Sequence, residues 1–139
     1  MSKVILDTSA LLAYLFEETG ADKVAPILEA GSGVIGSANY AELVTKLVDK
    51  NMPMPEILAV ISSLELEFIP QDEQQARLTG ELRAISKPFG LSLGDRACLA
   101  LGLATGLPVM TADQLWKDVA TGQDIKLMVI RDKPSFKKV

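Results

Sequence analysis

The hydrophobic pattern changes period along the first part of the chain. Consecutive apolar residues in Lys3–Asp7 predict a short strand that is buried on both faces, as in a parallel sheet. Apolar residues at helical spacing then predict two helices over about Ser9–Glu18 and Gly20–Ala30. A second short strand is expected at Gly33–Ser37. The chain therefore begins as a strand, two helices and a second strand.

The alternation of strands and helices continues toward the C-terminus. Further helices are predicted over about residues 40–50, 55–64, 72–85 and 92–105, and further strands over residues 67–69, 108–111 and 126–131. This order predicts an α/β fold with a central, mostly parallel sheet of about five strands. We find no repeat and no Gly/Ser-rich linker, so residues 1–139 are expected to form a single domain.

The composition is that of an ordinary globular domain. Apolar residues make up 48% of the 139 residues and charged residues 23%, which excludes an intrinsically disordered chain. The formal net charge of −4 gives no long-range attraction for nucleic acid, so any phosphate binding must be local or depend on a metal ion. No apolar run is long enough to span a membrane, and we expect a soluble, cytoplasmic protein.

Two residue counts restrict the possible chemistry. The chain has no histidine, which excludes Ser-His and Cys-His nucleophilic pairs and nearly every catalytic zinc site. Its one cysteine, Cys98, cannot form an internal disulfide, and this fits a reducing compartment.

Four acidic residues lie at predicted strand ends or helix starts: Asp7, Glu42, Asp95 and Asp113. A parallel sheet brings the carboxyl ends of its strands to one edge, where ligands bind. Carboxylates gathered there repel one another, by about 4 kcal/mol for two unit charges ~4 Å apart at an effective dielectric of 20. A site that offers only carboxylate oxygens, with no His or Cys ligand, is typical of Mg²⁺ or Mn²⁺. The hypothesis is a metal site.

Helix capping is the alternative explanation for each of these acids taken singly. Asp7 can cap the helix after it, and Asp113 can form a turn. The segments Asn39–Glu42 and Ser92–Asp95 both have the spacing of a capping box. A binding module with capping acids is thus one competing interpretation. It predicts that Asp7→Asn changes stability by about 1 kcal/mol and leaves activity indifferent to metal.

Four segments, in this order, resemble the PIN-domain family of metal-dependent nucleases, and in particular the VapC-type toxins of toxin–antitoxin pairs. They are Val4-Ile-Leu-Asp-Thr-Ser-Ala-Leu-Leu-Ala13, Asn39-Tyr-Ala-Glu-Leu43, Leu91-Ser-Leu-Gly-Asp-Arg-Ala-Cys-Leu-Ala100 and Pro108-Val-Met-Thr-Ala-Asp113, with Trp116 following the last. The resemblance implies a PIN-like three-layer α/β/α sandwich with the first strand central in its sheet.

The resemblance also implies a set of site residues. The four acids become the catalytic, metal-binding quartet, with Mg²⁺ as the cofactor and Mn²⁺ as a possible substitute. The supporting residues are Ser9 and Thr111, whose hydroxyls hold the carboxylates or a water; Asp118, a second late acid; and Arg96, which contacts phosphate, pairs with an acid or is a solvated charge. Glu42 is either a metal ligand or the base that receives the proton of water.

The implied activity is endoribonuclease cleavage of cellular RNA, typically a tRNA or rRNA, by metal-activated water. The implied partners are a cognate antitoxin, whose C-terminal segment lies over the active site, and a second copy of the chain in a homodimer. The helix pair within Leu43–Leu64 is open to two interpretations. Met52, Met54, Val60 and Leu64 are either core residues or an apolar groove for another chain's helix.

A phospho-accepting, receiver-like signalling domain is the competing interpretation from another class. It is also α/β, holds Mg²⁺ with strand-end acids and has a Lys-Pro pair after its last strand, as Lys133-Pro134 is here. Against it, the first strand ends in a single acid, and Ile69-Pro-Gln71 offers no phospho-accepting Asp. The basic tail Arg131–Val139, with Phe136, is either a phosphate-contacting strip or a solvated terminus.

Overall fold

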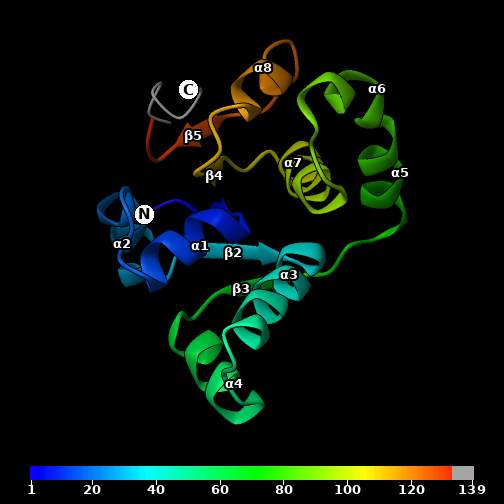
Figure 1. The fold of residues 1–139 in the computed structure, drawn as a ribbon. Coiled ribbons are helices and arrows are strands. Elements are labelled where there is room, and N and C mark those ends of the chain that lie inside the picture. The colour runs from blue at the N-terminus through cyan, green and yellow to red at the C-terminus, as the bar shows by residue number, and fades with distance from the viewer. Residues whose placement is uncertain (133–139) are drawn as a thin grey trace, which may run out of the picture.

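The computed structural model describes residues 1–132 and has the α/β sandwich that the strand and helix pattern predicts (Figure 1). Its five strands are β1 (Val4–Leu6), β2 (Gly33–Gly36), β3 (Glu67–Ile69), β4 (Val109–Thr111) and β5 (Leu127–Val129). They form one sheet in the order β3-β2-β1-β4-β5, and every pairing is parallel. The first strand is therefore central, as the resemblance implied.

Helices connect the strands and cover both faces of the sheet. They are α1 (Thr8–Leu15), α2 (Ala21–Glu29), α3 (Ser37–Asp49), α4 (Met54–Ser63), α5 (Glu73–Glu81), α6 (Arg83–Ser86), the 3₁₀ helix η1 (Lys87–Phe89), α7 (Leu93–Thr105) and α8 (Trp116–Ala120).

Alternate side chains of the central strand divide the core into two layers. Val4 and Leu6 point into a cluster built by α1 to α4, whereas Ile5 points into a cluster that contains the apolar face of α7 and Trp116 of α8. All three strand residues are at most 4% exposed. A strand buried on both faces explains why its sequence is continuously apolar.

Several helices differ from the sequence prediction, and α1 already ends three residues early, at Leu15. Helix α3 begins three residues early, at Ser37, because β2 passes directly into it. The helix predicted over residues 72–85 is divided into α5 and α6, and η1 follows; Gly90, with φ +66°, then ends the helical region. Helix α8 was not predicted, since five residues around one buried Trp give too few apolar positions to show a period.

The strand order argues against the receiver-like alternative. Receiver-type sheets of the flavodoxin kind have the order 2-1-3-4-5, in which the third strand is central. Here β3 lies at the edge of the sheet, and Pro70 and Gln71 follow it. The Lys133-Pro134 pair and the basic tail from residue 133 onward lie outside the described residues.

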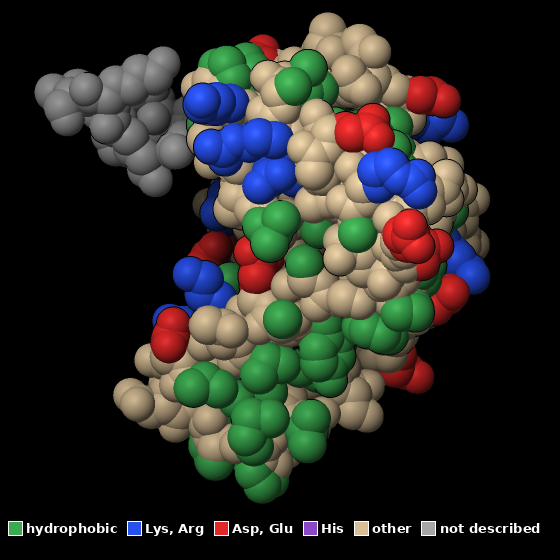
Figure 2. All heavy atoms as spheres, turned by 90° about the vertical axis from the view of Figure 1, so that its right-hand side faces the viewer, with side chains coloured by type: hydrophobic (Ala, Val, Ile, Leu, Met, Phe, Trp, Pro, Cys, Tyr) green, Lys and Arg blue, Asp and Glu red, His purple; other side chains and the backbone are tan. Residues whose placement is uncertain are grey.

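The α3–α4 pair carries an exposed apolar surface, visible in the lower part of the space-filling view (Figure 2). Val48 of α3 and Met54 and Leu58 of α4 are each about half exposed, whereas Leu64 is 4% exposed and belongs to the core. Of Met52, Met54, Val60 and Leu64, the four residues singled out in the sequence, Leu64 is therefore a core residue and Met54 a surface residue. Within residues 1–132, no helix is long and apolar enough to cross a membrane.

Candidate active-site cleft

The sheet topology places the four acidic residues around one cleft of about 200 Å³. Asp7 follows β1 and Asp113 follows the neighbouring strand β4, so both lie beyond the carboxyl edge of the sheet. Glu42 reaches the cleft from α3, and Asp95 reaches it from the first turn of α7. The acids are therefore gathered, which capping alone does not require.

Asp7 is the most buried of the four, at 3% exposed. Its carboxylate accepts hydrogen bonds from the backbone N–H of Ala10 (2.8 Å) and the hydroxyls of Thr111 (2.6 Å) and Ser9 (2.8 Å). It caps α1 and lines the cleft at the same time. Burial, helped to a smaller extent by the charge of Asp95, raises the pKa of Asp7 to about 7 against the lowering effect of the three hydrogen bonds.

Ser9 and Thr111 tie the ends of β1 and β4 together around that carboxylate. Ser9 Oγ accepts a hydrogen bond from the Ala112 N–H (2.9 Å), and Thr111 Oγ1 accepts one from the Asp113 N–H (3.0 Å). Asp113 Oδ1 in turn accepts from the Leu115 N–H (3.0 Å), which is the turn expected there. The two hydroxyls therefore fix the backbone that carries two of the acids.

Glu42 is held by two donors on a single oxygen. Thr8 Oγ1 and Asn39 Nδ2 both donate to Glu42 Oε1 at 2.8 Å, and Asn39 Nδ2 also lies 3.3 Å from the Gly94 carbonyl oxygen. Asn39 is inside α3, whose N-cap is Gly36, so the capping-box explanation of Asn39–Glu42 is wrong. The pair instead positions a carboxylate.

Asp95 combines capping with the electrostatics of the cluster. Its backbone N–H donates to Ser92 Oγ (3.1 Å), and its Oδ2 accepts from the Ser92 N–H (3.0 Å), which confirms the capping box at this position. Partial burial raises the pKa of Asp95, and the negative charges of Glu42 and Asp113 raise it further. The influence of Glu42 and Asp113 on the pKa of Asp95 requires that these acids lie near it.

Two of the expected supporting residues lie away from the cleft. Arg96 Nη1 donates to the Thr79 carbonyl of α5 (2.9 Å), so its side chain binds a neighbouring helix and neither pairs with an acid nor stands free in solvent. Successive helical residues point about 100° apart, which separates Arg96 from Asp95. Asp118 is exposed on α8 and is not among the residues that line the cleft.

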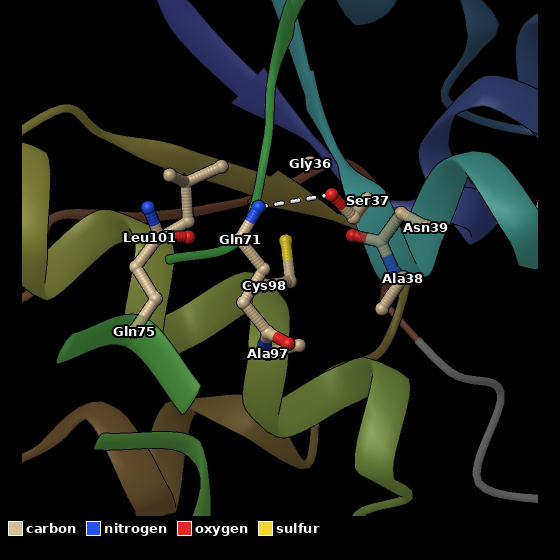
Figure 3. Close-up of a pocket in the computed structure, with 9 residues that line it drawn as sticks. All are labelled: Gly36, Ser37, Ala38, Asn39, Gln71, Gln75, Ala97, Cys98 and Leu101. Carbon is tan, nitrogen blue, oxygen red and sulfur yellow. Dashed lines mark hydrogen bonds between the residues drawn. The ribbon is translucent and has the colours of Figure 1, made fainter. Parts of the chain in front are cut away.

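The cleft also contains residues that the sequence did not single out as site residues. They are Thr8, Asn39, Leu12 and Lys46. Leu12 and Lys46 each lie four residues after a polar cleft residue on the same helix, a spacing that could have indicated them. Asn39 also lines a second, much smaller pocket beside Cys98 (Figure 3). Burial raises the pKa of the Cys98 thiol well above its usual value, so this cysteine is an unreactive core residue.

The donor set fits a hard divalent cation, although the carboxylates do not form a complete cage. All four acids offer oxygen, yet within the described residues no group of three or more His, Cys, Asp or Glu side chains is placed to hold a metal ion. Mg²⁺ usually keeps several waters and binds through one or two carboxylates, so it does not need such a group. Burial is the main cause of the raised pKa of Asp7, and a cation held beside its carboxylate would lower that pKa.

Comparison with known proteins agrees with the class that the fold and cleft define, an α/β domain with an acidic site at the carboxyl edge of its sheet. A model of the PIN domain matches residues 4–122. The chain therefore belongs to the PIN-domain family. A comparison with curated proteins finds no match.

Solved structures of toxin–antitoxin complexes have the same fold. DNA-bound VapBC from Salmonella typhimurium is 21% identical with a TM-score of 0.70, and a toxin–antitoxin complex from Klebsiella pneumoniae is 18% identical with a TM-score of 0.69; each match covers 94% of this chain and 100% of the other. VapBC-5 from Mycobacterium tuberculosis, 19% identical, has a TM-score of 0.61 with the same coverage.

Proposed function

We propose that this protein is a Mg²⁺-dependent endoribonuclease and the toxin of a toxin–antitoxin pair. Family membership supports a nuclease of the VapC kind. The observation that carries the proposal is the cleft itself, in which Asp7, Glu42, Asp95 and Asp113 come from four separate elements to one place. Capping explains the local bonds of Asp7 and Asp95, and a turn explains that of Asp113, but neither gives a reason for all four acids to meet.

The residues of the cleft have distinct tasks in this mechanism. The acids of the cleft would hold a divalent cation, which would supply an activated water and offset the charge that develops on the phosphoryl oxygens. Ser9 and Thr111 hold Asp7 in one orientation. Thr8 and Asn39 hold Glu42, which can serve as a ligand or accept the proton of the attacking water.

The partners proposed for the chain follow from its likeness to VapBC complexes. We propose a cognate antitoxin that covers the cleft, a homodimer and a cytoplasmic location. The exposed apolar residues Val48, Met54 and Leu58 support a protein contact at the α3–α4 pair, because contiguous apolar surface is costly to leave in water. A tRNA or rRNA is the proposed substrate class.

The chemistry of the cleaved ends tests this mechanism. Incubation of total cellular RNA with the protein and Mg²⁺ is expected to give products with 5′-phosphate and 3′-hydroxyl ends, because water and not the ribose 2′-hydroxyl attacks. EDTA should abolish cleavage, and added Mn²⁺ should restore it. Products that carry 2′,3′-cyclic phosphate, or full activity in EDTA, would contradict the proposal.

A further inference from the structure

Of the residues that the structure describes, nine line the cleft, and Lys46 is the only basic one among them. It lies on α3 four residues after Glu42, which places its Cα about 6 Å further along the helix axis. Its side chain is exposed, and none of the ion pairs found within residues 1–132 involves it, although four carboxylates line the same cleft. Lys46 is therefore a free cation at the mouth of an acidic site.

The cleft has two chemically different ends. The acids and their hydroxyl and amide partners form the inner end, at the sheet. The other end of the cleft is lined by Leu12 and Lys46. Leu12 lies one turn after Thr8 on α1, and Lys46 lies one turn after Glu42 on α3. These two helices pack against each other. The second end thus offers one apolar side chain and one exposed ammonium group.

We propose that Lys46 is a positioning residue that binds a phosphate of the RNA adjacent to the scissile one. This inference rests on the proposed nuclease function. A nucleic-acid chain laid along the cleft presents a second phosphate beyond the acids, where it meets a cation that forms no ion pair within the described part of the chain. Since the net charge of the whole chain is −4, attraction of RNA into this cleft depends on such local charge.

The variant Lys46→Ala tests the proposal, with Lys50→Ala as its matched control. Lys50, the C-cap residue of α3, is the next cation along the chain, but it lies over the ring of Phe16, 4.7 Å from its centroid, and does not line the cleft. With a short, fluorescein-labelled single-stranded RNA, Lys46→Ala should raise KM about tenfold and leave kcat within about twofold, which corresponds to one lost charged contact. Lys50→Ala should match the wild type, and Lys46→Arg should restore binding.

A neutral backbone linkage shows whether the lost contact is to a phosphate. Once the cleavage position in this RNA is mapped, a methylphosphonate is placed at each neighbouring linkage in turn. One placement should raise the KM of the wild type as much as Lys46→Ala does, and should have no further effect in that variant. The slope of the logarithm of the binding constant against the logarithm of salt concentration should also fall by about one in the Lys46→Ala variant.

The possible failures are distinguishable. If the wild type cleaves no RNA with Mg²⁺, the proposed function is wrong. If the wild type cleaves and Lys46→Ala has the same KM, or if the methylphosphonate effects add to that of the variant, the role of Lys46 is wrong. A change confined to the Mg²⁺ concentration needed for half-maximal rate would likewise overturn it, because Lys46 would then act on the acids.

Discussion

Replacing Asp7 by Asn is expected to lower the rate of RNA cleavage about a thousandfold while it stabilises the metal-free protein. Asp7 is buried and lines the cleft, where Ser9 and Thr111 orient its carboxylate. Loss of its negative charge removes a cation ligand, and a deficit of about 4 kcal/mol in transition-state stabilisation gives this factor. Cleavage of labelled RNA at saturating Mg²⁺ and pH 8 measures the rate.

The gain in stability has a defined pH dependence. Because burial raises the pKa of Asp7 from 3.8 to about 7, the folded protein keeps a proton that the unfolded chain releases. The free energy of unfolding of the wild type therefore falls as pH rises from about 4 to about 7. Asp7→Asn removes this loss and should be more stable by about 4 kcal/mol at pH 8, with little difference near pH 4. Urea denaturation in EDTA at both pH values measures the gain.

Asp72→Asn is the matched control for this substitution. Asp72 caps α5 with the same geometry, since its carboxylate accepts from the Gln75 N–H at 2.8 Å, but it is exposed and outside the cleft. It should change stability by less than about 1 kcal/mol and leave cleavage unchanged. If Asp7→Asn behaves as Asp72→Asn does in both assays, the acids are caps and the site is absent.

Adding a single methyl group at Gly94 is expected to lower cleavage about a hundredfold without loss of stability. A Cβ at this position of α7 would overlap the carboxylate of Glu42 and displace it from Thr8 and Asn39. A misplacement of about 1 Å in a catalytic group can cost this factor. Stability should hold, because Glu42 is a flexible side chain and Ala favours a helix over Gly by up to about 1 kcal/mol.

Gly80→Ala provides the control for Gly94→Ala. Gly80 also lies in a helix, α5, and nothing stands within 4 Å of the place where its Cβ would be. It should gain a similar increment of helix stability and keep full activity. The double variant Gly94→Ala/Glu42→Gln should be no less active than Glu42→Gln alone. Additive losses would show that Gly94 acts through something other than Glu42.

The parallel sheet and the meeting of the four acids could be predicted because both follow from the order of apolar strands and helices along the whole chain. A continuously apolar strand that ends in Asp7 fixes the position of that residue at the sheet edge, and the same holds for Asp113 after β4. Ser9 and Thr111 were likewise indicated, and both bind Asp7.

Side-chain direction within a helix could not be derived in the same way. Asn39 has the spacing of a capping residue, but α3 begins before it, and the side chain turns to Glu42. Arg96 is adjacent to Asp95 in sequence and yet binds α5, which no local pattern reveals. These details depend on how α3, α5 and α7 pack, and packing is set by contacts far apart in the sequence.

Direct titration with Mn²⁺, followed by the loss of the free-ion electron paramagnetic resonance signal, tests the central claim that the acidic cleft binds a divalent cation. The wild type should bind Mn²⁺ at pH 8, and Asp7→Asn, Glu42→Gln and Asp95→Asn should each weaken that binding at least about tenfold, while Asp72→Asn should not change it. Binding of equal strength in all five proteins, or no binding by the wild type at millimolar Mn²⁺, would contradict the account.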